Sequence, residues 1–221
     1  MLSVIHDKVT QLLFFMQCIS NHFDYICIKI RNNTYFQMFT ASQKRKENIA
    51  EYLLYMWQIE DLIRANDLDM DRIKENVIDR YTNLTENQRK EMAEWYESLI
   101  DMMRNENIEK QGHLQINKNI LSSLVALHQA LLKDPRFADY SAEFYKTLPY
   151  IVELRSKSGD EKPGEIETCF NALYGMLLMR LQQKEITPET LEAIKQISRF
   201  IAILARNFHL DEQDRLFEPK D

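Results

Sequence analysis

The chain has 221 residues with 45% hydrophobic and 28% charged side chains, and its four glycines and five prolines favour long helices over a disordered chain or a many-turned β protein. The formal net charge of −6 argues against non-specific nucleic-acid binding, and no stretch approaches the roughly 20 apolar residues of a membrane helix. Three scattered cysteines are too few for a disulfide framework or a zinc cluster, so we expect a cytoplasmic protein without a structural metal.

The first 40 residues differ in composition from the rest of the chain. Residues 1–38 include only five charged side chains but two of the three cysteines, and their apolar residues show no helical period. Met38 would serve as a start codon. We therefore interpret residues 1–40 as an over-extended gene start or a poorly packed appendage, although a helix or strand that covers the bundle is the alternative. This places the helical domain at residues 41–210 and a polar tail at residues 211–221.

The spacing of apolar residues predicts six or seven helices in an irregular all-α bundle. The first is expected over about residues 43–65, where Thr40 and Gln43 have the spacing of a capping box. A short helix over about residues 70–81 follows. No repeat of fixed length recurs, so a solenoid or a long coiled coil is not expected.

The next helix has the clearest pattern in the chain. Thr85 and Gln88 predict a capping box at its start, and apolar residues then recur at i, i+3 and i+4 to about residue 108. Gly112 interrupts the pattern, and Asn117 is expected to cap the helix that follows.

A further helix is expected to begin at Asp134 and Pro135, since proline is well placed in a first turn. Pro149 must kink or split this helix because it lacks a donor and clashes with the preceding turn. Residues 156–164 form the one clear loop, and a helix over about residues 165–184 follows it. The apolar residues of the helix that Pro149 interrupts are expected on its packed side: Phe137, Tyr140, Phe144, Leu148, Ile151 and Val152.

The last helix, over about residues 188–208, is apolar on most of its sides. Thr187 and Pro188 provide its N-cap and its first residue. Phe200 and Ile203 lie off the main apolar stripe. A helix of this kind is either central in the bundle or placed at an interface, so the alternatives are a core position and a homodimer contact.

Three polar residues, Glu60, His128 and Arg180, interrupt the apolar faces of separate helices. Burying a charge is costly unless it is paired, so the three could meet in one cluster. Such a cluster would be structural, or line a ligand pocket, or let Glu60 raise the pKa of His128 for acid–base work. The local alternatives are a Glu60–Arg64 pair, a bond from His128 to a backbone carbonyl, and Arg180 at a helix C-terminus.

The helix that carries Arg180 also carries two secondary candidates for functional site residues, Asn171 and Tyr174. Gly175, mid-helix, predicts a close approach of another helix, because glycine there costs about 1 kcal/mol relative to alanine. Cys169 faces the apolar side and is expected to be an inert core thiol.

Several chemistries that require fixed spacings are disfavoured. The chain has no paired Glu-x-x-His motif, no His-Glu-x-x-His and no glycine-rich phosphate loop. We therefore expect no cofactor and no metal, and assign no catalytic residue.

The run IAEYLLYMWQIEDLIR at residues 49–64, with residues 164–181, resembles a bacterial family known only as a domain of unknown function. The resemblance spans roughly residues 40–210 and implies an all-helical fold, without naming a catalytic residue. We expect a non-catalytic interaction or scaffold protein, homodimeric or bound to a protein partner, with no nucleic acid or membrane. The alternative is a small-molecule-binding protein or metal-independent enzyme that uses the predicted polar cluster.

Overall fold

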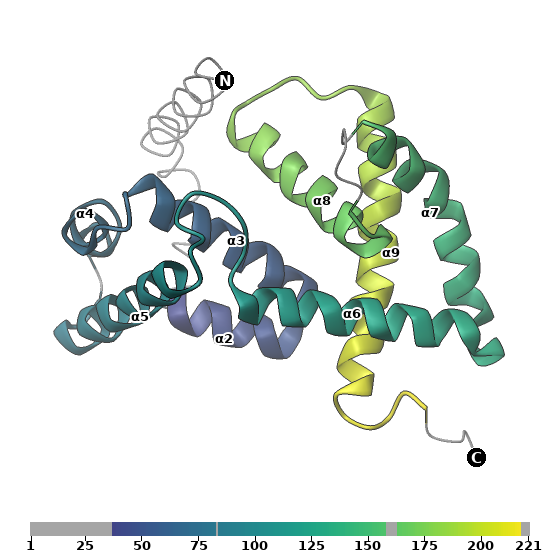
Figure 1. Ribbon diagram of the computed structural model, residues 1–221, viewed down its shortest axis with the longest axis horizontal. Helices are drawn as coiled ribbons and strands as arrows, with labels where there is room; N and C mark the ends of the chain where they lie inside the picture. Colours follow the sequence, from purple (N-terminus) through teal and green to yellow (C-terminus); the bar gives the residue numbers. More distant parts are fainter. Residues whose placement is uncertain (1–36, 83, 158–162, 218–221) are drawn as a thin grey trace. The chain divides into compact units, whose positions relative to one another are not determined.

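The computed structural model describes residues 37–82, 84–157 and 163–217, so the expectation for the N-terminal segment falls almost entirely outside the described residues. Within these ranges the chain forms eight α-helices and two short 3-10 helices, and no strand (Figure 1). The all-α prediction is confirmed, and the helix count is slightly higher than the six or seven expected. The elements are α2 (Gln37–Glu47), α3 (Ile49–Ala65), α4 (Met70–Asn76), η1 (Ile78–Arg80), α5 (Glu86–Asn105), α6 (Gln115–Lys133), η2 (Pro135–Phe137), α7 (Ala138–Ser156), α8 (Glu165–Leu181) and α9 (Pro188–Asp211).

The additional helix arises at Asn48, which separates α2 from α3. The Asn48 side-chain oxygen accepts hydrogen bonds from the backbone N–H groups of Ala50 (3.0 Å) and Glu51 (3.3 Å). Asparagine favours this N-cap position because it satisfies donors that the new helix leaves unpaired. The capping box predicted at Thr40 and Gln43 is wrong, since both residues lie inside α2.

Three other predicted helix starts are confirmed. The Thr85 hydroxyl accepts from the Gln88 N–H (3.3 Å), and the Gln88 side chain accepts from the Thr85 N–H (2.9 Å), which completes a capping box. The Thr187 hydroxyl accepts from the Thr190 N–H at the start of α9 (3.3 Å). Asp134 caps η2, which leads directly into α7.

One other local prediction is wrong, and one alternative of another is excluded. Asn117 does not cap α6, which begins two residues earlier, where the Gln115 N–H donates to the Glu106 carboxylate (2.7 Å). Of the two effects predicted for Pro149, a split is excluded, because α7 continues through it to Ser156, while a kink stays a prediction. Pro149 is exposed, so water can bond to the carbonyl that it leaves without a donor.

The chain divides into two compact units. Of the described residues, the first contains those of 55–115 with the short segments 37–43 and 181–183, and the second contains 44–54, those of 116–180 and 184–217. We call them the α5 unit and the α9 unit. The single helical domain predicted for residues 41–210 stays a prediction.

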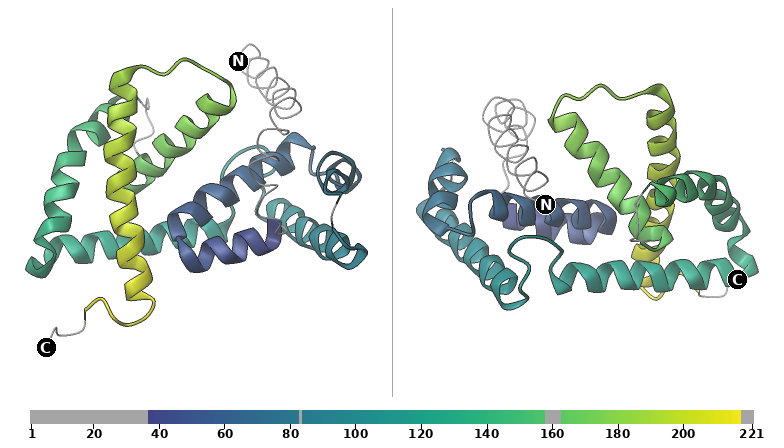
Figure 2. Two further views of the ribbon diagram at one scale, coloured as in Figure 1. Left: turned by 180° about the vertical axis from the view of Figure 1, so that it is seen from behind. Right: turned by 45° about the horizontal axis from the view of Figure 1, so that its top comes forward.

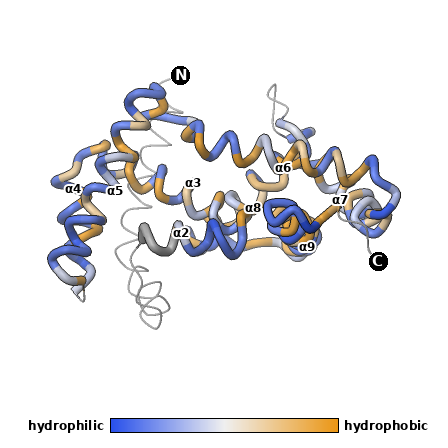
Figure 3. The backbone as a smooth tube through the Cα atoms, turned by 90° about the horizontal axis from the view of Figure 1, so that it is seen from below, coloured by the Kyte–Doolittle hydropathy of each residue, from blue (hydrophilic) through white to orange (hydrophobic). Residues whose placement is uncertain are grey.

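The α5 unit packs the C-terminal part of α3, α4 and α5 around a core of large side chains. Apolar residues alternate with polar ones along these helices, as expected for helices that bury one side (Figure 3). Side chains from α3, α4, α5 and the loop before α6 that are fully buried here include Ile63, Ile73, Met92, Tyr96, Ile100, Met103 and Leu114.

In the α9 unit, α9 runs beside α7 and crosses α6, as both orientations of the ribbon show (Figures 1 and 2). Phe200 of α9 is fully buried, with its ring centroid 5.6 Å from Tyr140 and 5.7 Å from Phe144. Ile203 is half-buried. Phe200, which lies off the main apolar stripe of α9, is thus buried in this core. Beyond α9, Phe217 of the predicted polar tail packs edge-on against Phe137 (5.6 Å).

None of the helices in the described ranges is both long enough and apolar enough to cross a membrane.

Candidate functional site

The loop between α5 and α6 is fastened to α3 by a buried acid, Glu60. Its carboxylate is 0% exposed and accepts the backbone N–H of Leu114 (2.9 Å) and Nδ1 of His113 (2.6 Å). Because a carboxylate only accepts, Nδ1 of His113 carries the proton of this bond. A buried acid is stabilised when its oxygens are hydrogen-bonded in this way.

Arg64, one turn further along α3, binds the backbone carbonyl groups of the same loop. Its guanidinium donates to the carbonyls of Ile108 (3.2 Å) and Gly112, and pairs with Asp61 (2.8 Å). Gly112 has a φ of +95°, which side-chain-bearing residues rarely adopt, and this turn brings the loop back toward α3. Glu60 thus accepts N–H groups of the loop, and Arg64 donates to its carbonyl groups. We call these two residues and their bonds to the loop the α3 clasp.

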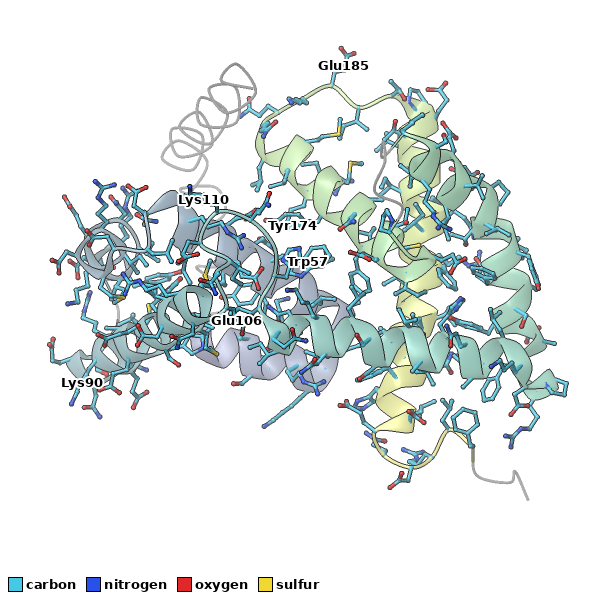
Figure 4. The ribbon with its side chains drawn as sticks, in the orientation of Figure 1. Trp57, Lys90, Glu106, Lys110, Tyr174 and Glu185 are labelled. Atoms are coloured by element: carbon cyan, nitrogen blue, oxygen red, sulfur yellow. The ribbon has the colours of Figure 1, made fainter. Side chains whose placement is uncertain are left out.

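The clasp fixes the ring of His113 at the surface of the α5 unit. The indole of Trp57 stacks on the imidazole with a centroid distance of 4.1 Å and an interplanar angle of 13°. The His113 side chain is 34% exposed, and its Nε2 makes no hydrogen bond to any residue in the described ranges. Figure 4 labels Trp57 on α3 with Glu106 and Lys110 in the loop. An imidazole oriented by a carboxylate can bind a ligand or move a proton.

His128 occupies a different environment, in the core of the α9 unit. It is 3% exposed, and its Nδ1 lies 2.6 Å from the Tyr140 hydroxyl. Burial lowers the pKa of His128, an effect that the charge of Glu165 partly offsets, and burial raises the pKa of Tyr140. The tyrosine therefore keeps its proton and donates to a neutral imidazole. The partner of His128 is thus a hydroxyl rather than the predicted backbone carbonyl.

The predicted cluster of Glu60, His128 and Arg180 is distributed over the two units. Glu60 belongs to the α5 unit, while His128 and Arg180 belong to the α9 unit. Each of the two buried members has a hydrogen-bond partner within its own unit, and Arg180 is exposed at the C-terminal end of α8. The joint cluster stays a prediction. His113 was not predicted from the sequence, because it lies in a loop, where no helical period marks it.

The secondary candidates lie on α8. Asn171 is exposed and Tyr174 is half-buried. A Cβ atom built on Gly175 would meet no described atom within 4 Å, so the predicted close helix approach is wrong. Cys169 is fully buried, and burial, reinforced by the charge of Glu165, raises the pKa of its thiol to about 12, in agreement with an inert core thiol.

A second buried acid, Glu143 on α7, was not predicted. It is 4% exposed and accepts from Nε2 of Gln196 (2.9 Å) and from Nε of Arg199 (3.1 Å), both on α9. Gln196 also donates to the Thr147 hydroxyl (3.0 Å), which donates to the Glu143 carbonyl (2.8 Å). These bonds fix α7 against α9, which is a structural role.

The opposite face of α7 is apolar and exposed. It carries Ala142, Tyr145, Pro149 and Val152, which we call the outer stripe. Tyr145 is 64% exposed and Val152 is 57% exposed. The placement of Val152 on the packed side is therefore wrong, and α7 presents apolar residues on two opposite sides.

In the described ranges, no group of three or more His, Cys, Asp and Glu side chains is arranged to hold a metal ion.

Comparison with known proteins gives the family of the chain. No curated protein and no solved structure matches the chain. A family described as a domain of unknown function, DUF4924, matches residues 38–215, which is well over half of the sequence and agrees with the resemblance seen at residues 49–64 and 164–181; the chain belongs to this family.

Proposed function

We propose that this protein is a non-catalytic helical interaction or scaffold protein, and that the outer stripe of α7 is part of its binding surface. The observation that carries the proposal is the exposure of Tyr145 (64%) and Val152 (57%) on a helix whose other side is already buried. Isolated apolar residues are common on protein surfaces, whereas apolar residues aligned along one helix face are typical of contact sites. Tyrosine is also enriched among residues that dominate binding energies.

The polar features of the two units support the same proposal. The α3 clasp holds a loop, and the Glu143 bonds join α7 to α9. A structural role therefore explains why the carboxylates of Glu60 and Glu143 are buried, without a catalytic one. The low and scattered cysteine content supports a cytoplasmic location, and the family resemblance supports a bacterial source. The net charge of −6 supports a protein partner over nucleic acid.

The test compares the full chain with a double variant, Tyr145→Lys with Val152→Lys, which places two charges on the outer stripe. Light scattering after size exclusion, and chemical cross-linking followed by mass spectrometry, would record the complexes that each forms, with itself or with a defined partner. We expect the double variant to lose them while its circular dichroism and melting temperature are unchanged. Leu191→Lys on α9, at a residue 43% exposed, is the matched control. Identical association of all three proteins would refute the proposal.

A second candidate function, the binding of a small molecule or metal-independent catalysis, is supported by the exposed imidazole of His113. Its Nδ1 is fixed by Glu60, and the ring is held by Trp57, so the remaining nitrogen is pre-oriented. A thermal-shift screen of metabolites against the wild type and His113→Ala tests it, because a ligand of the native state raises the melting temperature. A compound that stabilises only the wild type would favour this function, and a screen without such a compound would count against it.

A further inference from the structure

The charges beside the outer stripe indicate which partner it fits. The stripe residues are separated by three, four and three positions, the spacing with which one helix packs along another. Lys146 and Glu153 are seven residues apart, so they lie on the same edge of the stripe. Their side chains are 64% and 61% exposed. One edge of the stripe therefore carries a positive charge toward its N-terminal end and a negative charge toward its C-terminal end.

From this arrangement we infer that the outer stripe binds a second copy of the same chain, with the two α7 helices antiparallel about a two-fold axis. This inference rests on the proposed interaction function and names its partner. In an isologous contact the same patch faces itself, so a patch must be complementary to its own rotated copy. An antiparallel pair brings Lys146 of each copy opposite Glu153 of the other. In a parallel pair this edge of one helix would face the other edge of its partner, so Lys146 and Glu153 would not meet.

The apolar residues fit the same axis. The midpoint between Tyr145 and Val152 differs from the midpoint between Lys146 and Glu153 by one residue, or about 1.5 Å along the helix. A single two-fold axis near Pro149 thus places Tyr145 of one copy close to Val152 of the other and aligns the charged edges as well. The present partners of the charged residues do not oppose this arrangement. Lys146 lies 3.5 Å from the buried Glu143, which also accepts from Gln196 and Arg199. Glu153 lies 2.6 Å from Lys157 in an exposed pair of a kind that contributes little.

The dimer is expected to be weak. One helix from each copy buries less than the roughly 800 Å² per partner of a stable complex, so we expect a dissociation constant on the order of micromolar or higher. Association should therefore depend on protein concentration, and it should weaken with salt because exposed charges contribute to it.

The experiment is a charge swap, measured on the full chain by sedimentation velocity over a range of concentrations. Lys146→Glu and Glu153→Lys each turn both cross-pairs of the dimer into repulsive ones, and each should raise the dissociation constant by about tenfold. The double variant with both changes restores the opposite charges and should return to within about threefold of the wild type. Lys195→Glu, an exposed reversal on α9, is the control for net charge and should leave association unchanged.

Three results would overturn the inference, and they separate it from the proposed function. A wild-type chain that stays monomeric at all concentrations excludes the second copy, and the interaction function then stands only if the Tyr145→Lys, Val152→Lys variant loses another partner. A dimer that this variant abolishes but the charge swap leaves unchanged contradicts the antiparallel arrangement. A dimer that neither set of changes affects uses a different face, which contradicts the inference and removes the support for the function.

Discussion

Removal of the Glu60 carboxylate should destabilise the α5 unit, because that group supplies the acceptors of the α3 clasp. In Glu60→Ala the N–H of Leu114, a fully buried residue, loses its acceptor, which costs about 1–3 kcal/mol. The lost bond to His113 adds roughly 1 kcal/mol, less than for a buried pair, because the ring is 34% exposed and water can replace the carboxylate. We therefore expect a decrease in the free energy of unfolding of about 2–4 kcal/mol.

Two further variants separate the bond to Leu114 from the bond to His113 and provide a surface control. Glu60→Gln retains an oxygen for the Leu114 N–H but replaces the oxygen that accepts from His113 with an NH2 group, so it should cost about 1 kcal/mol. Glu97→Ala removes an exposed glutamate from α5 and should stay within about 0.5 kcal/mol of the wild type.

Tryptophan fluorescence during urea unfolding is suited to this measurement, since both tryptophans of the chain, Trp57 and Trp95, lie in the α5 unit. With a denaturant slope of about 2 kcal/mol/M, the midpoint of Glu60→Ala should fall by about 1–2 M. Circular dichroism would follow the helices of both units. Equal midpoints for Glu60→Ala and Glu97→Ala would refute the assignment of the clasp. A loss as large for Glu60→Gln as for Glu60→Ala would show that the charged bond to His113, rather than the acceptor for the Leu114 N–H, dominates.

Three other predictions concern the α9 unit. Because burial lowers the pKa of His128, the unfolded state binds more protons below about pH 6.5, so wild-type stability should fall as the pH drops through that value toward the lowered pKa. His128→Gln should lack this part of the pH dependence in urea midpoints. Cys169, whose thiol pKa burial raises to about 12, should resist alkylation by N-ethylmaleimide in the native protein and react in guanidinium chloride, as mapped by mass spectrometry. Gly175→Ala should stabilise the protein by about 0.5–1 kcal/mol, measured by urea unfolding, because the new methyl group meets no described atom.

Each of these has a distinct contrary result. A pH dependence that is the same in the wild type and His128→Gln would show that other groups account for it. Rapid native labelling of Cys169 would indicate that α8 opens readily. A destabilising Gly175→Ala would mean that the space beside this glycine is occupied in solution.

Local signals in the sequence were sufficient for helix starts that depend on neighbouring residues alone. The capping box of Thr85 and Gln88 and the cap at Thr187 need only residues within one turn, and both are present. Thr40 has a similar pattern and does not cap, because the chain is already helical before it. The side chain of Asn48 decides where the helix restarts, although the apolar period of α3 gave no sign of a boundary there.

The burial of polar residues was predictable, but their partners were not. Glu60 and His128 interrupt apolar faces, and both are buried as the pattern indicates. Their partners, His113 in a loop and Tyr140 on another helix, depend on how the chain returns in space. Glu143 carries the same signal as Glu60, since it lies on the packed side of α7, so its burial was also predictable from the sequence.

α7 has two apolar sides, and its polar residues explain why one side is buried and the other is exposed. The side chosen for the core carries Glu143, whose carboxylate meets polar groups of α9, while the other side carries Pro149. Proline leaves the carbonyl of Tyr145 without its helical donor, and burying that carbonyl unpaired would cost about 1–3 kcal/mol. The proline side therefore faces water. This carbonyl limits any partner of the outer stripe, a second copy included, because the partner must either offer it a donor or leave a water molecule in place.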